Sequence, residues 1–147
     1  MVSVVIREIL DVPALKQVWP VMQQLRPHLS EQKFIDLVAL MRPEGFRIAA
    51  AFDNAVCVAV TGFRIQHYLH RGKNLYVDDL VTDTALHGRG YGKSLLDWLK
   101  LEAARQGCDN LHLDSGTQRL GAHAFYFAQG MKISSFHFIV DIDPPSE

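Results

Sequence analysis

The chain has 147 residues, which suits a single domain with its own hydrophobic core. Its 48% hydrophobic and 21% charged residues are typical of a soluble globular protein, and the net charge of −1 gives no reason to expect a nucleic-acid partner. Because no apolar run reaches the length of a membrane span, and the two cysteines lack a disulfide-framework spacing, we expect one cytoplasmic domain over 1–147 with no membrane partner.

The first half of the chain predicts elements in the order β-α-α-β-β. Their ranges are 2–6, 13–25, 30–41, 46–52 and 55–65. Asp11 is a candidate cap for the first helix, and Pro20 inside this helix predicts a kink or an early break. The second helix opens at Ser30, and Asp53-Asn54 is typical of a tight turn in a β-hairpin. Residues 66–73 then predict a polar connection.

The most informative stretch is a strand, a glycine-rich loop and a helix that follow one another. Apolar and β-branched residues over 75–82 predict a buried strand, and leucines at helical spacing over 90–106 predict an amphipathic helix. Between them lies Gly88-Arg89-Gly90-Tyr91-Gly92. Exposed N–H groups and the dipole at a helix start favour an anion, and glycine lets a ligand approach the backbone. This stretch therefore predicts a site for a phosphate-bearing ligand.

The spacing of the glycines distinguishes between phosphate-binding motifs. A P-loop requires a glycine where His87 stands, and a G-x-G-x-x-G dinucleotide motif requires one where Lys93 stands. The pattern that fits residues 87–92 is Arg/Gln-x-x-Gly-x-Gly/Ala, with His87 in the position of the usual Arg or Gln. In this respect the loop resembles the acyl-CoA loop of the GNAT superfamily of CoA-dependent N-acyltransferases.

The rest of the chain predicts a strand, a helix, a final strand and a frayed tail, at 110–114, 122–129, 133–142 and 143–147. All elements together predict a mixed α+β fold: a mostly antiparallel central sheet flanked by helices, with one parallel pair of strands joined by the central helix. This element order is also that of the GNAT fold. Residues 122–131 resemble the family's second motif, A-x-x-F-Y-x-x-x-G followed by Phe or Met, at the expected distance.

The resemblance implies an N-acetyltransferase that moves the acetyl group of acetyl-CoA directly to a primary amine of a small molecule, peptide or protein, without a metal. It also implies acetyl-CoA contacts in two parts of the chain, with Arg119 standing where the family often has Asn. The implied contact residues are Leu80, Val81, Thr82, His87, Gly88, Arg89, Gly90, Tyr91, Gly92, Lys93, Ser115, Arg119 and Phe125. Leu80 and Thr82 would engage the acyl and pantetheine parts through their backbone groups.

Acyl transfer to an amine needs a base, because an amine with a pKa near ~10.4 is mostly protonated at neutral pH. Asp78 and Asp79 lie in the central strand beside the implied acyl site, and either is a candidate for this base. Because neighbours on a strand point to opposite faces, we expect only one of them to face the substrate unless a β-bulge intervenes. Tyr126 matches the family position of the acid that protonates the departing thiolate.

Other interpretations stay open at this stage. A GNAT-like domain can bind acyl-CoA as a non-catalytic sensor, and a nucleotide-phosphate-binding protein is a weaker alternative because the P-loop spacing fails. His67 and His70 have a metal-like spacing but no nearby carboxylate or cysteine to complete a site. Ser115-Gly116 lacks the flanking pattern of a hydrolase nucleophile. The sequence identifies neither the amine nor the oligomeric state, and it leaves a homodimer open.

Overall fold

The computed structural model describes residues 4–146, so the predicted strand residues Val2 and Ser3 and the tail residue Glu147 lie outside the described part. The chain forms two compact units, Met1–Leu113 and Asp114–Glu147. The expectation of a single domain over 1–147 stays a prediction. Between residues 4 and 146, no helix has both the length and the apolar character that a membrane crossing requires.

The first unit is built on a five-stranded sheet whose strands lie side by side in sequence order. The first four strands pair antiparallel, and the fifth pairs parallel with the fourth. The strands are β1 Val4–Glu8, β2 Phe46–Asp53, β3 Val56–Tyr68, β4 Gly72–Thr82 and β5 Asn110–Leu113. The predicted parallel pair is therefore β4 and β5.

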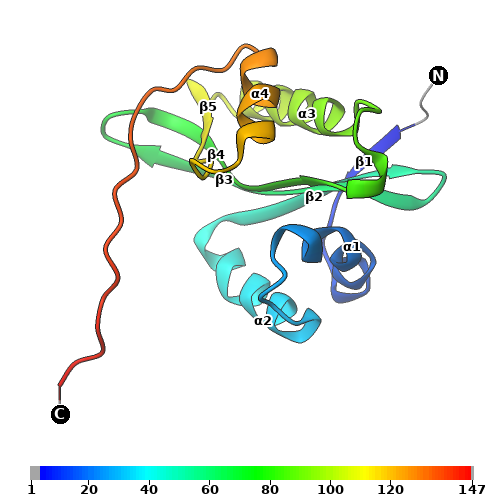
Figure 1. Cartoon of the computed structure of the whole chain (residues 1–147), viewed down its shortest axis with the longest axis horizontal. Helices are drawn as coiled ribbons and strands as arrows, with labels where there is room; N and C mark the ends of the chain where they lie inside the picture. The colour runs from blue at the N-terminus through cyan, green and yellow to red at the C-terminus, as the bar shows by residue number, and fades with distance from the viewer. Residues whose placement is uncertain (1–3, 147) are drawn as a thin grey trace. The chain divides into compact units, whose positions relative to one another are not determined.

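Helices cover both faces of this sheet. α1 (Val12–Leu25) and α2 (Glu31–Met41) lie on one face, and α3 (Tyr91–Arg105) lies on the other (Figure 1). Short 3-10 helices follow α2 at Arg42–Glu44 and β4 at Thr84–Leu86. This arrangement confirms the predicted mixed α+β class with a mostly antiparallel sheet flanked by helices.

The predicted starts of the first two helices are confirmed by their caps. The side chain of Asp11 accepts a hydrogen bond from the N–H of Ala14 at 2.9 Å, and the Ser30 hydroxyl accepts one from the N–H of Lys33 at 3.1 Å. Pro20 does not end α1 early, because the helix continues for a further turn beyond it. Packing of the apolar face of α1 against the sheet outweighs the hydrogen bond that proline removes.

The two hairpins of the sheet differ from their predicted positions. Asn54 and Ala55 both have positive φ, at 50° and 65°, so the two-residue turn between β2 and β3 lies one residue later than predicted. Residues 66–73 are not a loose connection, because β3 and β4 extend through most of this range. The buried Asn74 amide donates to the carbonyls of Gln66 and Gly72, at 3.2 and 3.0 Å, and ties this second hairpin together.

Both faces of the sheet bury apolar side chains, which fixes β4 between two packed layers. The cluster under α1 and α2 includes Val18, Met22, Phe34, Ile48 and Val60, each at most 5% exposed. The cluster under α3 includes Ala51, Ala59, Tyr91 and Leu95. Close packing of this kind resists small displacements, so side chains carried by β4 are held on a rigid element.

The second unit contains α4, Leu120–Ala128, close to the predicted helix. Residues 129–146 form no helix or strand, so the predicted final strand over 133–142 is wrong for this structure. Its apolar side chains, Ile133, Phe136, Phe138, Ile139, Val140 and Ile142, are all more than 70% exposed. The sequence pattern reports only strand propensity, whereas a strand also needs a neighbour that pairs with its backbone.

Candidate active site

A β-bulge in β4 turns both candidate aspartates toward the same side of the sheet. Gly62 on β3 pairs with Asp79, but the next residue, Phe63, pairs with Val77, so Asp78 is an extra residue without a partner in the β3 register. Asp78 and Asp79 consequently line one cavity. The expectation that strand alternation turns one of them away is wrong, and the bulge is the physical reason.

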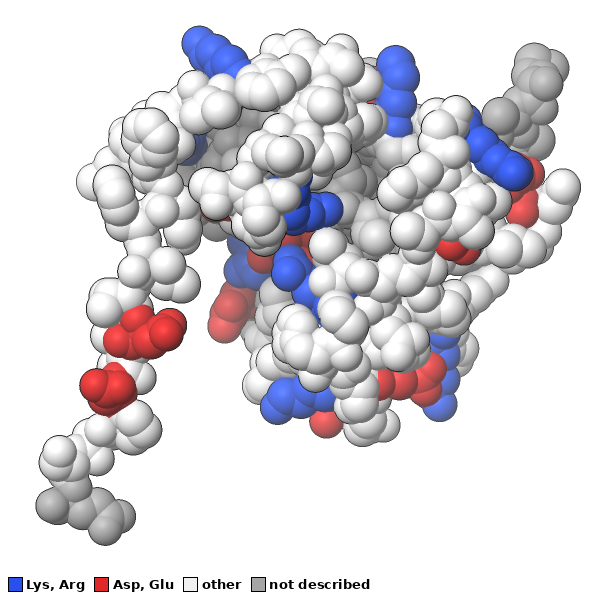
Figure 2. Space-filling model, viewed as in Figure 1, with Lys and Arg blue, Asp and Glu red and all other residues white. Residues whose placement is uncertain are grey.

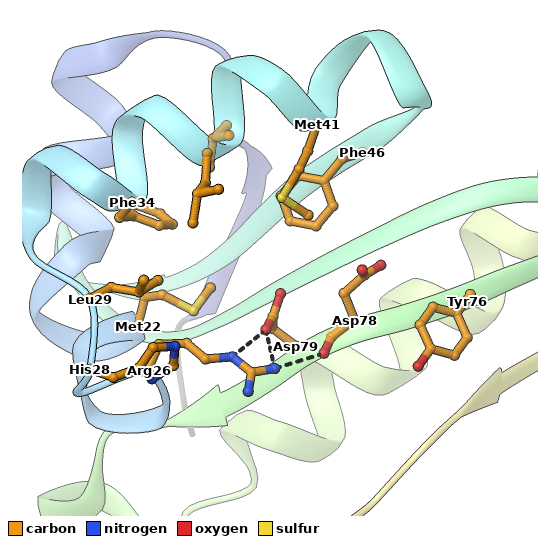
Figure 3. A pocket seen from close by; sticks show the side chains of 12 residues that line it. Met22, Arg26, His28, Leu29, Phe34, Met41, Phe46, Tyr76, Asp78 and Asp79 are labelled. Atoms are coloured by element: carbon orange, nitrogen blue, oxygen red, sulfur yellow. Dashed lines mark hydrogen bonds and ion pairs between the residues drawn. The ribbon is translucent and has the colours of Figure 1, made fainter. Parts of the chain in front are cut away.

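This cavity lies between β4 and the two helices α1 and α2, and it has a volume of about 410 Å³ (Figure 3). Its apolar lining comes from Met22, Leu29, Phe34, Leu37, Val38, Met41 and Phe46. Its polar lining comes from Arg26, His28, Tyr76, Asp78 and Asp79. A mostly apolar pocket with a few convergent polar groups is typical of a small-molecule site.

Asp79 is the more buried of the two carboxylates, with 13% of its side chain exposed. Its Oδ1 accepts hydrogen bonds from Nε and Nη2 of Arg26, at 2.8 and 2.6 Å, and Figure 3 shows its second oxygen directed away from Arg26. Burial raises the pKa of Asp79 above its ordinary value, and the attraction to Arg26 opposes this shift only in part. A carboxylate with a raised pKa and one oxygen not bonded to Arg26 is suited to accept a proton.

Asp78 is held differently, because both of its oxygens are bonded to Arg64. Nε of Arg64 donates to Oδ1 at 3.1 Å, and Nη2 donates to Oδ2 at 2.9 Å. The guanidinium of Arg64 lies over the ring of Phe46, with 5.5 Å between its central carbon and the ring centroid. A carboxylate held at both oxygens by a stacked arginine is better suited to shaping the cavity than to taking a proton.

The space that Asp79 occupies depends on Gly62, its cross-strand partner. A Cβ atom on residue 62 would lie 2.7 Å from Oδ2 of Asp79 and 2.5 Å from Cζ of Phe46. Both separations are well below van der Waals contact, so any side chain at this position would displace the carboxylate or the ring. Glycine in the interior of a strand often marks such a close approach, and here it accommodates the candidate base.

The outer edge of β4 is open beside the aspartates. Its pairing with β5 ends at Val77, although β4 continues to Thr82. The N–H of Asp83 donates to the carbonyl of Val58 on β3 at 2.9 Å, so strand alternation turns the N–H and carbonyl groups of Leu80 and Thr82 to the opposite edge. This is the arrangement expected for backbone groups that engage an acyl-pantetheine chain.

The glycine loop leads into α3 in a conformation that exposes N–H groups. Gly88 and Gly90 have φ values of 81° and 84°, in the left-handed region that favours glycine. The first backbone hydrogen bond inside α3 runs from Ser94 to Gly90, so the N–H groups of residues 91–93 precede it. No side chain caps α3, in contrast to α1 and α2. Three uncapped N–H groups and the helix dipole are an arrangement suited to an anion.

Two of the predicted acetyl-CoA contacts point their side chains into the protein. The Tyr91 ring is 4% exposed, and its hydroxyl donates to Oδ2 of Asp53 at 2.6 Å, which anchors the start of α3 to the end of β2. The Val81 side chain packs against the apolar cluster under α1 and α2. A contact of Tyr91 with a ligand would therefore use its backbone groups, whereas the N–H and carbonyl of Val81 point toward β3 and not toward the open edge.

The charged side chains around the loop differ in their availability. Lys93 forms an exposed ion pair with Asp97 one turn further along α3, at 2.7 Å. The exposed His87 ring has Nε2 3.3 Å from the carbonyl oxygen of Thr82, so it bridges the loop and the end of β4. Arg89 is exposed between the two left-handed glycines. Of these groups, Arg89 is best suited to supply positive charge to a phosphate.

The remaining predicted site residues belong to the second unit. Arg119 stands at the N-terminal cap of α4, and the rings of Phe125 and Tyr126 meet edge to face with centroids 5.5 Å apart. Burial raises the pKa of the Tyr126 phenol, and the charge of Arg119 opposes this shift, so the phenol keeps its proton at neutral pH. The Ser115 hydroxyl is buried without a hydrogen-bond partner among the described residues. Such an orphaned group fits a ligand contact, and the roles of all four residues stay predictions.

The sequence interpretation missed three parts of the cavity. Arg26 belongs to no sequence motif. It follows the end of α1 and lies 53 residues before Asp79 in the sequence, so only the folded structure brings the two side chains together. Phe46 resembles any core aromatic residue. Gly62 did offer a signal, since a glycine inside an apolar strand often marks a bulge or a close approach.

The described part of the chain shows no metal-binding cluster, and Figure 2 shows no patch of a single charge sign on the face it displays. No group of three or more His, Cys, Asp or Glu residues there could hold a metal ion. Acidic and basic side chains are interspersed on the face shown in Figure 2, without a single-sign patch on that face. The functional chemistry therefore concentrates at the cavity, the open edge of β4 and the start of α3.

Comparison with known proteins gives a consistent result. A family model described as "Acetyltransferase (GNAT) family" matches residues 12–131. An uncharacterized N-acetyltransferase of Bacillus subtilis (strain 168), YhdJ, is 34% identical over 122 residues, which are 82% of this chain and 86% of the relative. An aminoalkylphosphonate N-acetyltransferase of Salmonella typhimurium (strain LT2) is 28% identical over 116 residues, which are 78% of this chain and 75% of the relative.

Solved structures share the fold over nearly the whole chain. The aminoglycoside N-acetyltransferase AAC(6')-Iy in complex with CoA has a TM-score of 0.83 at 14% identity, and the match covers 97% of this chain and 96% of that one. Glucosamine-6-phosphate N-acetyltransferase from Arabidopsis thaliana has a TM-score of 0.75 at 21% identity, covering 96% of this chain and 99% of that one. At these identities the matches show a shared fold.

Proposed function

Because the chain belongs to the acetyltransferase (GNAT) family, we propose that it transfers the acetyl group of acetyl-CoA directly to a primary amine held in the cavity beside Asp79. Family membership confirms the resemblance inferred from the two motifs, the expected N-acetyltransferase activity and acetyl-CoA as co-substrate. The sensor alternative finds no support among the relatives, which are named as N-acetyltransferases. The observation that carries the proposal is the bulge that directs both carboxylates into one cavity.

We assign the pyrophosphate of acetyl-CoA to the loop over residues 87–92. The N–H groups of residues 91–93 face the loop without intrahelical partners, and the exposed Arg89 adds positive charge. A Cβ at Gly88 or Gly90 would meet no atom within 4 Å, so the glycines leave open space beside the backbone. The buried side chain of Tyr91 leaves only its backbone groups for this contact.

Asp79 is the proposed base. The ammonium form of the acceptor would bind between Asp79 and the apolar side chains that line the cavity. Oδ2 of Asp79 would take its proton before the amine attacks the thioester. Removing this proton in solution costs roughly 4–5 kcal/mol at pH 7 for an amine with a pKa near ~10.4. Asp78 would act indirectly, because its bidentate bond with Arg64 fixes the bulge that aims Asp79.

The open edge of β4 is the proposed position of the reacting thioester. The N–H of Leu80 would donate to the oxyanion that forms at the thioester carbonyl when the amine attacks. The C–S bond then breaks, and Tyr126 would protonate the departing thiolate of CoA. The amine nitrogen keeps the new N–C bond and gives up its second proton, which would restore the Tyr126 phenol, while Asp79 would release the first proton to solvent.

Measuring product and CoA together tests this proposal. The enzyme is incubated with acetyl-CoA and a panel of primary amines, and the N-acetyl product is identified by mass spectrometry while free CoA thiol is counted. Equal amounts of product and thiol are expected from the wild type. Asp79→Asn should lose most of the activity, whereas Asp36→Asn, which changes an exposed carboxylate on α2, should not. Binding of acetyl-CoA without any amine-dependent product would contradict the proposal.

A further inference from the structure

We infer that the acceptor is a primary amine carried by an apolar, uncharged body, such as an alkylamine or an arylalkylamine. The inference rests on the proposed function and adds the chemical class of the substrate. It sets this chain apart from the relatives named for acceptors of other chemistry, an aminoalkylphosphonate and an aminoglycoside. The observation behind it is an apolar wall, formed by side chains of α1, α2 and the start of β2, that faces one oxygen of Asp79 not bonded to Arg26.

The apolar wall argues against a polyhydroxylated acceptor. Met22, Phe34, Val38 and Phe46 are each at most 5% exposed, so this part of the cavity is lined by side chains that offer no hydrogen bonds. A hydroxyl group placed there would lose its hydrogen bonds with water and gain none in return. An amino sugar carries such groups on most of its carbons, whereas an alkyl or aryl body gains free energy from the same burial.

The charged groups argue against an acidic or multiply charged acceptor. The guanidinium of Arg26 donates twice to Asp79 and once to the backbone carbonyl of Asp78, and Arg64 is bonded to both oxygens of Asp78. Because both arginines are already paired with carboxylates, a phosphonate would meet little net positive charge here and would lie beside the negative charges of Asp78 and Asp79. A second ammonium group would find no carboxylate oxygen beyond the one that receives the first. His28 and Tyr76 are the other ionisable side chains in the lining, and neither is a carboxylate, so the cavity suits one positive charge.

The size of the cavity sets the scale of the apolar body. At roughly 30 Å³ for each water-sized group, a volume of about 410 Å³ holds on the order of ten to fifteen non-hydrogen atoms. The ring of Tyr76 adds an aromatic surface near the carboxylates, which suits an ammonium group or a second ring. Hexylamine and 2-phenylethylamine fit within this size, with the amine directed at Asp79.

A series of amines measures the contribution of the wall. We expect kcat/KM to rise roughly three- to fourfold for each methylene from propylamine to hexylamine, because each adds one buried CH₂. Glucosamine and 2-aminoethylphosphonate should be acetylated roughly 100-fold less efficiently than hexylamine. Leu37→Asn, in the cavity wall, should flatten the alkylamine series. The matched control Leu40→Asn lies on the same helix with the side chain 69% exposed, and it should leave the series unchanged.

Calorimetry with acetyl-CoA separates the inference from the proposed function. If acetyl-CoA binds and the polar amines react as well as hexylamine, the acceptor class is wrong and the proposed function stands. A flat alkylamine series, or an equal effect of the two leucine substitutions, likewise overturns the acceptor class. If acetyl-CoA binds and no amine of either kind is acetylated, the proposed function is wrong and the inference falls with it. A rising series that only Leu37→Asn flattens supports both.

Discussion

Gly62→Ala tests whether the position of Asp79 controls catalysis. The added Cβ would lie 2.7 Å from Oδ2 of Asp79 and 2.5 and 2.8 Å from two ring atoms of Phe46. To reach a normal contact of 3.4 Å, the carboxylate must retreat by about 0.7 Å and the ring by about 0.9 Å. The ring is only 4% exposed, so the bonded carboxylate has to absorb part of the shift.

Two consequences of Gly62→Ala can be scaled from these distances. Overpacking a buried site costs about 1–3 kcal/mol, which for a chain of this length lowers Tm by roughly 3–10 °C. A displacement of reacting groups by about 1 Å can reduce the rate by up to ~100-fold, so we expect kcat/KM to fall between about 10- and 100-fold. Acetyl-CoA affinity should change little, because the glycine loop and the start of α3 lie outside this contact.

The assay combines thermal unfolding, calorimetry with acetyl-CoA and amine kinetics. Ile9→Val is the control for stability alone, since Ile9 is fully buried, does not line the cavity and should lose about 0.5–1.5 kcal/mol. If Gly62→Ala acts through Asp79, adding it to Asp79→Asn should cost little further activity. Wild-type kcat/KM at a lowered Tm would refute the reasoning, because the base would then tolerate displacement.

Three further predictions concern other parts of the site. Because the pKa of Asp79 is raised in the folded protein, its ionised form opposes folding above that pKa. Asp79→Asn should therefore have a Tm at neutral pH that matches or exceeds that of the wild type. Thermal unfolding across pH should show this difference in Tm shrinking as the pH falls. Gly90→Val should abolish acetyl-CoA binding in calorimetry, because a β-branched residue is strained at a φ of 84° and would cover the exposed N–H groups; wild-type affinity would contradict the loop assignment. Tyr126→Phe should lower kcat by about 10²-fold with acetyl-CoA affinity nearly unchanged, and an unchanged chemical rate in single-turnover kinetics would show that Tyr126 is not the acid.

Local signals in the sequence were sufficient to predict most of the helices and turns of the first unit. The caps at Asp11 and Ser30 and the glycines at 88 and 90 act within a few residues of their own positions, so their effects can be predicted without knowledge of the fold. The same holds for the apolar periodicity of the helices. The family could also be identified from the sequence, because its two motifs occur in the right order and at the right spacing along the chain.

Features that depend on pairing across the sheet could not be predicted in the same way. Strand alternation separates Asp78 from Asp79, and only the shift of the β3–β4 register at Gly62 brings them to one side. The partnership of Arg26 with Asp79 likewise depends on where α1 ends above the sheet. Residues 133–142 show the converse error, since strand propensity alone does not supply a pairing partner.

The most direct test of the proposed mechanism is the ratio of wild-type to Asp79→Asn kcat/KM as a function of pH, with hexylamine as the acceptor. With the Asp79 carboxylate as base, the wild type can use the abundant ammonium form, so its kcat/KM should be flat between the pKa of Asp79 and that of the amine. The variant depends on free amine from solution, which falls about tenfold for each pH unit below ~10.4. The ratio should therefore grow about tenfold per pH unit from pH 9 to pH 7. A ratio that stays constant over this range would contradict the assignment of Asp79 as the base.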